Sequence, residues 1–149
     1  MRVAIINGPN LNLLGIREPG LYGGRSWEGF ENSLRDKYPE MEIIVHQSNV
    51  EGELINLLHR YGLPGAVQVR GIILNAGGYS HTSVSIADAV AALPIPVISV
   101  HISNIYKREP ERHLELIAKS AQGGIYGLGL RGYELALRWI LDEQQSGGV

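Results

Sequence analysis

Polar side chains that can do chemistry follow four apolar runs of this chain. They occupy residues 7–12, 47–49, 75–81 and 101–104, directly after each run. These segments supply amides, hydroxyls and the imidazoles of His81 and His101, which can bind a polar small molecule and move protons. Asn and Ser also form turns and caps, but their recurrence after successive runs favours a binding site.

A long connection, residues 8–25, follows the first of these runs. Long connections in compact domains are typically lids or binding segments, and the glycines of this one can act as hinges. Before Arg25, its groups that can carry charge chemistry are Arg17, Glu18 and Tyr22. Tyr22 fits two interpretations: an aromatic packed on the surface, or a base whose phenol is acidified by a neighbouring guanidinium.

The elements that must position these residues follow from the hydrophobic pattern. Apolar runs predict strands at residues 2–7, 41–47, 71–74, 96–101 and 124–126. Helical spacing predicts helices at 26–37, from about 48 to 62, at 84–93, near 111–121 and at 133–143. Strands rich in Ile and Val that alternate with helices predict an α/β doubly wound sandwich with a five-stranded parallel sheet. Ligands bind such sheets at the carboxyl ends of the strands.

Local signals refine these predictions. Trp27, Phe30 and Leu34 are expected to share one helix face, and Trp139 and Ile140 are expected to point inward, as their spacing indicates. Ser48 with Glu51 predicts a capping box at the second helix. Gly123 is expected to cap the helix at 111–121 in the left-handed conformation.

Composition narrows the functional classes. The 149 residues fit a single domain, 1–149, with residues 144–149 as a loose tail. Thirteen basic against 15 acidic residues give a net charge of −2, which disfavours nucleic-acid or membrane partners and favours a small molecule. The absence of cysteine excludes disulfides, thiolate nucleophiles and Cys-ligated metals. No segment resembles a secretory signal, so we expect a cytoplasmic protein.

Several familiar motifs can be weighed against these features. Residues 127–132 match the dinucleotide fingerprint GxGxxG, but their place in the last strand-helix unit favours a tight turn. No Gly-Lys-Ser/Thr phosphate loop occurs. Asn7 and Asn75 stand where a phosphoryl-accepting receiver domain would need acidic residues. The five histidines lack the spacing of a metal site. Imine catalysis needs a lysine amine at the ends of the strands, and the chain has only three lysines, two on predicted helices and one in a loop, which disfavours it.

Four ordered blocks of the sequence resemble one known family. They read GPNLNLLG with REP and YG after the first strand, QSNVEG after the second, NAGGYSHTS after the third and VHISN at the fourth. This combination is similar to the type II 3-dehydroquinate dehydratases, and the resemblance runs to Leu137. It implies a flavodoxin-like fold with strand order 2-1-3-4-5 and a homo-oligomer, a dodecamer built from trimers.

The implied activity is a step of the shikimate pathway, the dehydration of 3-dehydroquinate through an enolate, without metal or cofactor. In this resemblance Tyr22 matches the base, Arg17 the lid arginine, Asn10 the residue that holds a water, and His101 the general acid. The substrate-binding positions match Asn75, His81, Ile102, Ser103 and Arg112, and Asp88 matches the acid that reaches a neighbouring subunit's site.

This assignment also makes chemical sense. An enolate mechanism needs a base, a donor for the oxyanion and an acid for the leaving hydroxyl. Arg17 would favour the tyrosinate form of Tyr22. The Ser103 hydroxyl and the main-chain N–H groups after the fourth strand could form a nest for the substrate carboxylate, and Arg112 and His81 could hold ring hydroxyls.

Two positions depart from the family pattern. Ser99 stands where a glutamate usually precedes the acid histidine by two residues, so the pH profile is expected to shift. Ala76 replaces a usual proline and is expected to loosen the loop around Asn75. The alternative function is a flavin- or nucleotide-binding module on the same fold, which the glycine-rich segments favour.

Overall fold

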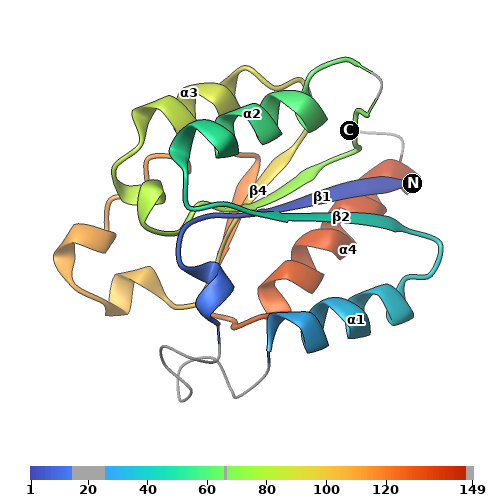
Figure 1. The fold of residues 1–149 in the computed structure, drawn as a ribbon, viewed down its shortest axis with the longest axis horizontal. Coiled ribbons are helices and arrows are strands. Elements are labelled where there is room, and N and C mark those ends of the chain that lie inside the picture. Colours follow the sequence, from blue (N-terminus) through green and yellow to red (C-terminus); the bar gives the residue numbers. More distant parts are fainter. Residues whose placement is uncertain (15–25, 66, 147–149) are drawn as a thin grey trace.

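Five parallel strands form the centre of the molecule (Figure 1). The computed structural model describes residues 1–14, 26–65 and 67–146. The strands are β1 (Arg2–Asn7), β2 (Glu42–Gln47), β3 (Ile72–Asn75), β4 (Val97–His101) and β5 (Gly123–Tyr126). Their order is β2-β1-β3-β4-β5 and all four pairings are parallel, which confirms the predicted sheet.

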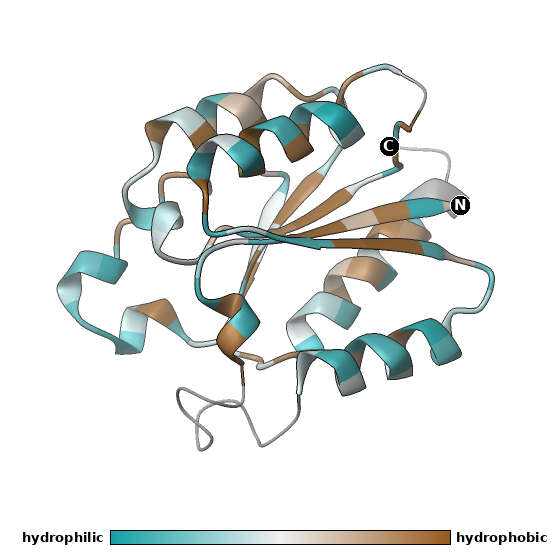
Figure 2. Cartoon of the chain, in the orientation of Figure 1, coloured by the Kyte–Doolittle hydropathy of each residue, from teal (hydrophilic) through white to brown (hydrophobic). Residues whose placement is uncertain are grey.

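Helices cover both faces of this sheet. Helices α1 (Trp27–Lys37) and α4 (Arg131–Gln145) lie on one face, and α2 (Glu51–Gly62) and α3 (Val84–Ala91) lie on the other (Figure 1). Short 3₁₀ turns η1 (Leu11–Leu13), η2 (Gly77–His81), η3 (Ile105–Lys107) and η4 (Pro110–Arg112) follow the ends of β1, β3 and β4. The apolar strands between polar helix surfaces are evident in Figure 2.

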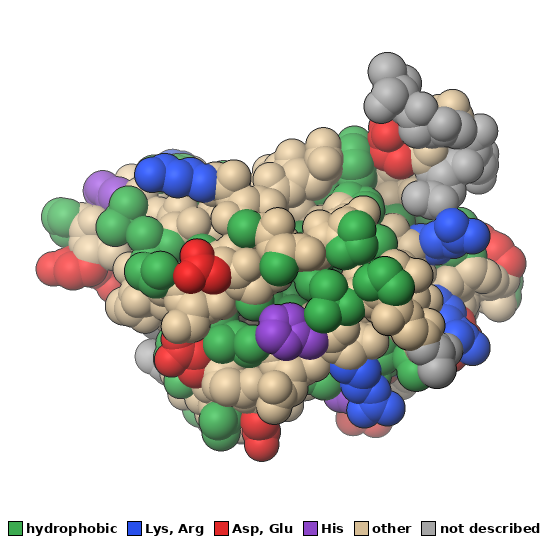
Figure 3. All heavy atoms as spheres, turned by 90° about the horizontal axis from the view of Figure 1, so that it is seen from above, with side chains coloured by type: hydrophobic (Ala, Val, Ile, Leu, Met, Phe, Trp, Pro, Cys, Tyr) green, Lys and Arg blue, Asp and Glu red, His purple; other side chains and the backbone are tan. Residues whose placement is uncertain are grey.

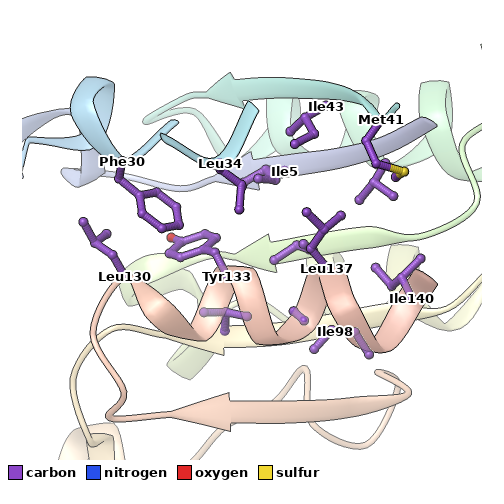
Figure 4. Packing of buried hydrophobic residues seen from close by; sticks show 14 of the residues in the cluster. Ile5, Phe30, Leu34, Met41, Ile43, Ile98, Leu130, Tyr133, Leu137 and Ile140 are labelled. Carbon is purple, nitrogen blue, oxygen red and sulfur yellow. The ribbon is translucent and has the colours of Figure 1, made fainter. Parts of the chain in front are cut away.

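Two hydrophobic clusters, one on each face, hold these layers together. Under α1 and α4, Phe30, Leu34 and Leu137 meet strand residues such as Ile5 and Ile98 (Figure 4). Burial of such side chains contributes roughly 1.5–3 kcal/mol each. As predicted, Phe30, Leu34 and Ile140 are buried, whereas both tryptophans are only partly buried against this cluster.

The crossover from β4 to β5 differs from the prediction. Residues 111–121 form no α-helix, and Gly123 is the first residue of β5 rather than a helix cap. The Leu116 N–H donates to the carbonyl of Ser80 at 2.8 Å, and the Leu114 carbonyl is bound to the ring of His81. These contacts with the β3 loop take main-chain groups that a helix would use internally, so tertiary pairing overrides helix propensity.

The predicted capping box at α2 is also wrong. The helix begins at Glu51, with Val50 as its N-cap and no side-chain cap. The Ser48 hydroxyl accepts from the Val50 N–H and donates to Glu53, whereas Glu51 accepts from Ser83 at the start of α3. Ser48 therefore organises the turn before the helix, and Glu51 links α2 to α3.

Element bounds elsewhere differ from the predicted ones by at most two residues, the scatter usual at element ends. Figure 3 shows the face over α2 and α3, where hydrophobic and uncharged groups cover much of the centre and most of the charged groups lie toward the edges. In the described part of the chain, no helix combines the length and the apolar character that crossing a bilayer requires.

Candidate active site

A cleft of about 190 Å³ opens at the carboxyl ends of β1, β3 and β4. This is where the strand order reverses, the position at which doubly wound sheets bind ligands. The cleft is bordered by three loops and includes two arginines and one histidine but no carboxylate; its lining residues are Pro9, Asn10, Leu11, Leu13, Leu14, Asn75, Gly77, Gly78, His101, Ile102, Ser103, Ile105, Arg108 and Arg112. An anionic ligand therefore meets a favourable charge balance among these residues.

Close backbone packing joins the loops after β1 and β3. The Gly8 N–H donates to the Asn75 carbonyl at 2.7 Å, and a Cβ at Gly8 would lie 2.5 Å from the Ala76 carbonyl oxygen. Gly77 has a φ of +58°, and a Cβ there would press on Pro9 at 3.1 Å. Glycine is needed at both positions because a side chain would push the loops apart.

Asn75 is fixed on both sides of its amide. Its Oδ1 accepts from the Gly77 N–H at 3.1 Å, and its Nδ2 donates to the Tyr133 hydroxyl at 2.8 Å. That hydroxyl donates in turn to Asn7 Oδ1 at 2.8 Å. An amide nitrogen carries two donors, so Asn75 can still offer an N–H to a ligand in the cleft.

This network bears on the effect expected of Ala76. The Asn75 amide and the Gly8 N–H tie the loop from both sides, and Ala76 itself is buried, with 1% exposure. The contacts of the neighbouring residues therefore supply constraint that a proline at position 76 would otherwise add.

The end of β4 places three predicted residues at the cleft, His101, Ile102 and Ser103. In the described part of the chain, the main-chain N–H groups of Ile102 and Ser103 have no hydrogen-bond acceptor. The Ser103 hydroxyl accepts from Arg108 Nη1 at 3.4 Å. Adjacent main-chain donors, a hydroxyl and a guanidinium form an arrangement suited to a carboxylate.

His101 is buried, with 6% exposure, and its ring packs against two other rings. Its Nε2 lies 3.4 Å from Oε1 of Glu115. The ring of His81 stacks on it at 5.7 Å between centroids, and the ring of Tyr126 on β5 lies at 5.6 Å. Burial and the nearby Glu115 charge raise the pKa of Tyr126, so this phenol stays protonated.

His81 lies beside the cleft with its tautomer fixed. Its Nδ1 donates to the Leu114 carbonyl at 2.7 Å, which leaves Nε2 as the acceptor of the neutral ring. This Nε2 is buried without a partner among the described residues. Burial lowers the pKa of His81, with smaller contributions from the nearby His101 and Arg112 charges, so the ring is neutral at pH 7.

Both arginines of the cleft are positioned by one glutamate. Glu109 Oε1 accepts from Arg112 Nε at 2.6 Å, and Glu109 Oε2 lies 3.7 Å from Arg108 Nε. The hydrogen bond from Arg112 lowers the pKa of Glu109, so the carboxylate remains charged. Each guanidinium keeps further N–H groups that can bind a ligand.

Asn10 also lines the cleft, and its backbone is left-handed, with a φ of 67°. Its N–H donates to Asn49 Oδ1 at 3.0 Å, which ties the β1 loop to the β2 loop. Asparagine tolerates this conformation better than most residues.

One predicted site residue among the described residues lies away from this cleft. Asp88 is exposed on α3 and does not line this chain's cleft. Arg17 and Tyr22 lie outside the described residues, as does the rest of the predicted lid from residue 15 on.

Three residues with evident roles were missed by the sequence reasoning. Arg108 stands close after the fourth polar segment, and a search for cations near strand ends could have found it. Tyr133 and Glu115 gave no such signal, because each lies far along the chain from its partners.

The fingerprint at residues 127–132 has a structural role. Gly127 and Gly129 have φ values of +79° and +61°, and their N–H groups donate to the carbonyls of His101 and Ile102. The glycines thus form the predicted tight turn from β5 to α4 and dock it on the end of β4. Among the described residues, no group of three or more His, Asp or Glu is placed to hold a metal ion.

Comparison with known proteins agrees with this architecture. The family described as "Dehydroquinase class II" matches residues 1–141. The chain belongs to this family. A 3-dehydroquinate dehydratase of Exiguobacterium sp. is 46% identical over 147 residues, covering 98% of each chain. Another, of Afipia carboxidovorans, is 44% identical over 137 residues, covering 91% of this chain and 89% of its own.

Solved structures of the family have the same fold. The type II dehydroquinase of Butyrivibrio crossotus superimposes with a TM-score of 0.87 at 39% identity, covering 94% of this chain and 97% of its own. That of Propionibacterium acnes gives 0.85 at 37% identity, covering 93% and 94%. The type II resemblance and the flavodoxin-like topology are therefore confirmed, and the comparisons favour the dehydratase function over the flavin- or nucleotide-binding alternative.

Proposed function

We propose that this chain, a 3-dehydroquinate dehydratase by family, converts 3-dehydroquinate to 3-dehydroshikimate in the shikimate pathway through an enolate intermediate. The observation that carries the proposal is the cleft itself. It combines an imidazole, two guanidiniums and main-chain donors that have no acceptor among the described residues, and none of its described lining residues is acidic. The substrate is a carboxylate with ring hydroxyls and a ketone, which matches these groups.

The substrate carboxylate binds at the end of β4 in this proposal. Ile102 and Ser103 both line the cleft, and Arg108, which lines it as well, contacts the Ser103 hydroxyl. Main-chain N–H groups hold anions well because their dipoles are already oriented. The carboxylate would also take the Arg108 guanidinium as a charged partner.

The ring hydroxyls meet the other polar groups. The second N–H of Asn75, which lines the cleft, can donate to one hydroxyl. His81, whose ring stacks on that of His101 beside the cleft, is assigned to another. Arg112 keeps donors beyond its bond to Glu109. Because their own contacts hold these groups, they can orient the ring for reaction.

Proton abstraction is assigned to Tyr22, with Arg17 as its activating neighbour. A guanidinium close to a phenol favours the tyrosinate, which can take the proton α to the ketone. The electron pair moves onto the carbonyl oxygen, and a water held by Asn10 donates a hydrogen bond to that enolate. Tyr22 and Arg17 belong to the connection that is interpreted as a lid from its sequence, of which residues 8–14 are described and are joined to the loops after β2 and β3.

His101 completes the reaction as the general acid. When the enolate collapses, the carbon–oxygen bond breaks, and the imidazolium transfers its proton to the departing hydroxyl, which leaves as water. One proton is removed and one returned, so the step balances without a cofactor. The contact between Nε2 and Glu115 leaves Nδ1 as the nitrogen for this transfer.

Enone formation from 3-dehydroquinate tests the proposal, because the conjugated product absorbs ultraviolet light that the substrate does not. We expect turnover by the purified protein in the presence of a chelator. Tyr22→Phe and His101→Ala should each lower kcat by at least ~10²-fold with smaller effects on KM, as for groups that act in the transition state. Near-normal turnover in either variant would reject that residue's role.

The arrangement in the cell is also part of the proposal. The resemblance supports a homo-oligomer, a dodecamer built from trimers, working in the cytoplasm. Asp88 is exposed on α3, which fits a residue that reaches the site of a neighbouring subunit. Sedimentation of the wild-type protein and of Asp88→Ala, each with kinetics, tests this: an unchanged oligomer with unchanged kinetics removes Asp88 from the site.

A further inference from the structure

Glu115 is a buried carboxylate in the segment that joins β4 to β5. Its side chain is 2% exposed and its Oε1 lies 3.4 Å from His101 Nε2. The Ser99 hydroxyl donates to the same Oε1 at 3.1 Å, while the buried Oε2 has no partner in the described chain. A carboxylate rarely occupies such a position unless a charged or hydrogen-bonding partner compensates it.

We propose that Glu115 is a positioning residue for the reaction, which orients the His101 imidazole and stabilises its protonated form. The inference rests on the proposed role of His101 as general acid. Glu115 does not line the cleft, so it acts through His101 rather than on the substrate.

The first argument is charge. Several titratable or charged groups face His101 or share its cleft; they are Glu115 on the crossover, His81 on η2, Tyr126 on β5, Arg108 after η3 and Arg112 on η4. The two guanidiniums disfavour a second positive charge nearby, and His81 and Tyr126 are neutral at pH 7. Among the described residues around His101, Glu115 is the one that favours the imidazolium.

The second argument is orientation. A hydrogen bond from one ring nitrogen to a carboxylate fixes both the tautomer and the rotation of an imidazole. The bond to Nε2 presents Nδ1 as the working nitrogen, while stacking on His81 at 5.7 Å limits tilting of the ring. Ser99 in turn holds the Glu115 carboxylate from β4.

The third argument is how the chain places Glu115. The segment does not form the predicted helix because Leu114 and Leu116 bond to residues of η2. These two bonds flank Glu115 and hold it against β4. Ile117, fully buried two residues later, anchors the same segment in the core.

The test compares Glu115→Gln with wild type in the enone assay over a range of pH. Gln keeps the shape and can still accept from Ser99, but it has no charge. We expect kcat to fall roughly 10-fold to 100-fold, as when carboxylates that orient other imidazoles are removed, with KM changed less than about twofold, as for a group away from the substrate. The alkaline limb of the kcat profile should move to lower pH.

Two further variants separate this role from a structural one. Ser99→Ala removes the hydroxyl and leaves the carboxylate, so its alkaline limb should stay in place. The exchange Ser99→Glu with Glu115→Ser returns a carboxylate from β4, on the strand face that His101 shares, and should restore the limb. Melting temperatures are measured for all variants. If Glu115→Gln does not fold, the exchange variant is compared with Ser99→Gln combined with Glu115→Ser, which differs from it only in having an amide instead of a carboxylate at position 99.

Specific outcomes overturn the inference. One is an unchanged pH profile in Glu115→Gln; another is a loss that is uniform across pH, follows the melting temperature and persists in the exchange variant. Failure of the proposed function looks different, because wild type itself would then form no enone. If wild type is active and His101→Ala is nearly as active, His101 is not the general acid. The role of Glu115, which depends on it, is then rejected as well.

Discussion

Single residues of this site owe their positions to partners far away in the sequence. Asn75 and Asn7 end adjacent strands, yet the Tyr133 hydroxyl from α4 joins their side chains inside the protein. All three residues are buried, with at most 3% exposure. Buried polar groups are costly without partners, so the network couples the stability of the fold to the orientation of Asn75 in the cleft.

Tyr133→Phe tests this coupling. The variant keeps the ring, which packs against Trp27 at 5.0 Å between centroids, but leaves the Asn75 donor and the Asn7 acceptor unsatisfied. We expect the free energy of unfolding to fall by about 1–3 kcal/mol, measured by urea denaturation, and KM to rise as Asn75 reorients. Tyr106→Phe, on a half-exposed ring, should change stability by less than about 0.5 kcal/mol. Equal effects of the two variants would contradict the network.

At the scale of elements, the helices and strands that were predicted correctly depend on residues close together in the sequence, and the one that was predicted wrongly depends on residues far apart. The strands and most helices were predicted because apolar periodicity is a local property of the sequence. The segment 111–121 was predicted as a helix from the same kind of pattern, but its main chain bonds to residues 80–81. That pairing depends on tertiary contacts between residues at least 33 positions apart, which no local pattern encodes.

The candidate site shows the same division. Asn10, Asn75, His101, Ile102, Ser103 and Arg112 were predicted from their place after strands and from the family resemblance, and all of them line one cleft. Glu115 was not predicted, although Ser99 had raised the question of a carboxylate near His101. Which carboxylate lies near His101 depends on the path of the chain between β4 and β5, and that path was predicted incorrectly.

The turn from β5 to α4 offers a prediction at this scale. Gly127 has a φ of +79°, and a Cβ there would lie 2.7 Å from the Asn104 Cβ. We expect Gly127→Ala to cost about 2 kcal/mol or more, because both the left-handed backbone and the contact are unfavourable. The free energy of urea unfolding measures this loss.

Gly52 provides the matched control. It lies in the first turn of α2, and a Cβ there would meet nothing within 4 Å. Gly52→Ala should therefore stabilise the protein by about 0.5 kcal/mol, through helix propensity and reduced freedom of the unfolded chain. If Gly127→Ala were tolerated as well as Gly52→Ala, the turn would not need its glycine.

The whole molecule concentrates function at one edge of the sheet and stability at its two faces. Both hydrophobic clusters are formed mainly by strands and helices, while the cleft is bordered mainly by loops, short turns and the ends of strands. This division lets the loops carry polar groups that the core could not accommodate. One histidine of interest lies at the cleft and another in the sheet. His81 adjoins the cleft, and His46 lies on the edge strand β2, where its Nε2 is hydrogen-bonded to the Tyr61 hydroxyl at 2.6 Å.

These two histidines predict how stability depends on pH. Burial lowers the pKa of both below the ordinary value of 6.5, assisted at His46 by the charge of Arg60. Below about pH 6.5 the unfolded chain binds protons that the folded rings resist, so the free energy of unfolding should decrease as pH falls. Urea denaturation at several pH values between about 7.5 and 5.5 measures the slope.

His46→Gln should flatten that slope, because a side chain that does not titrate removes the difference between folded and unfolded states at this position. His59→Gln is the matched control on the exposed side of α2, and it should leave the slope nearly as in wild type. A slope that responds equally to both substitutions would show that burial of His46 does not set the pH dependence. Because His46 does not line the cleft, turnover by His46→Gln at pH 7.5 should match wild type, which separates the stability of the sheet edge from catalysis.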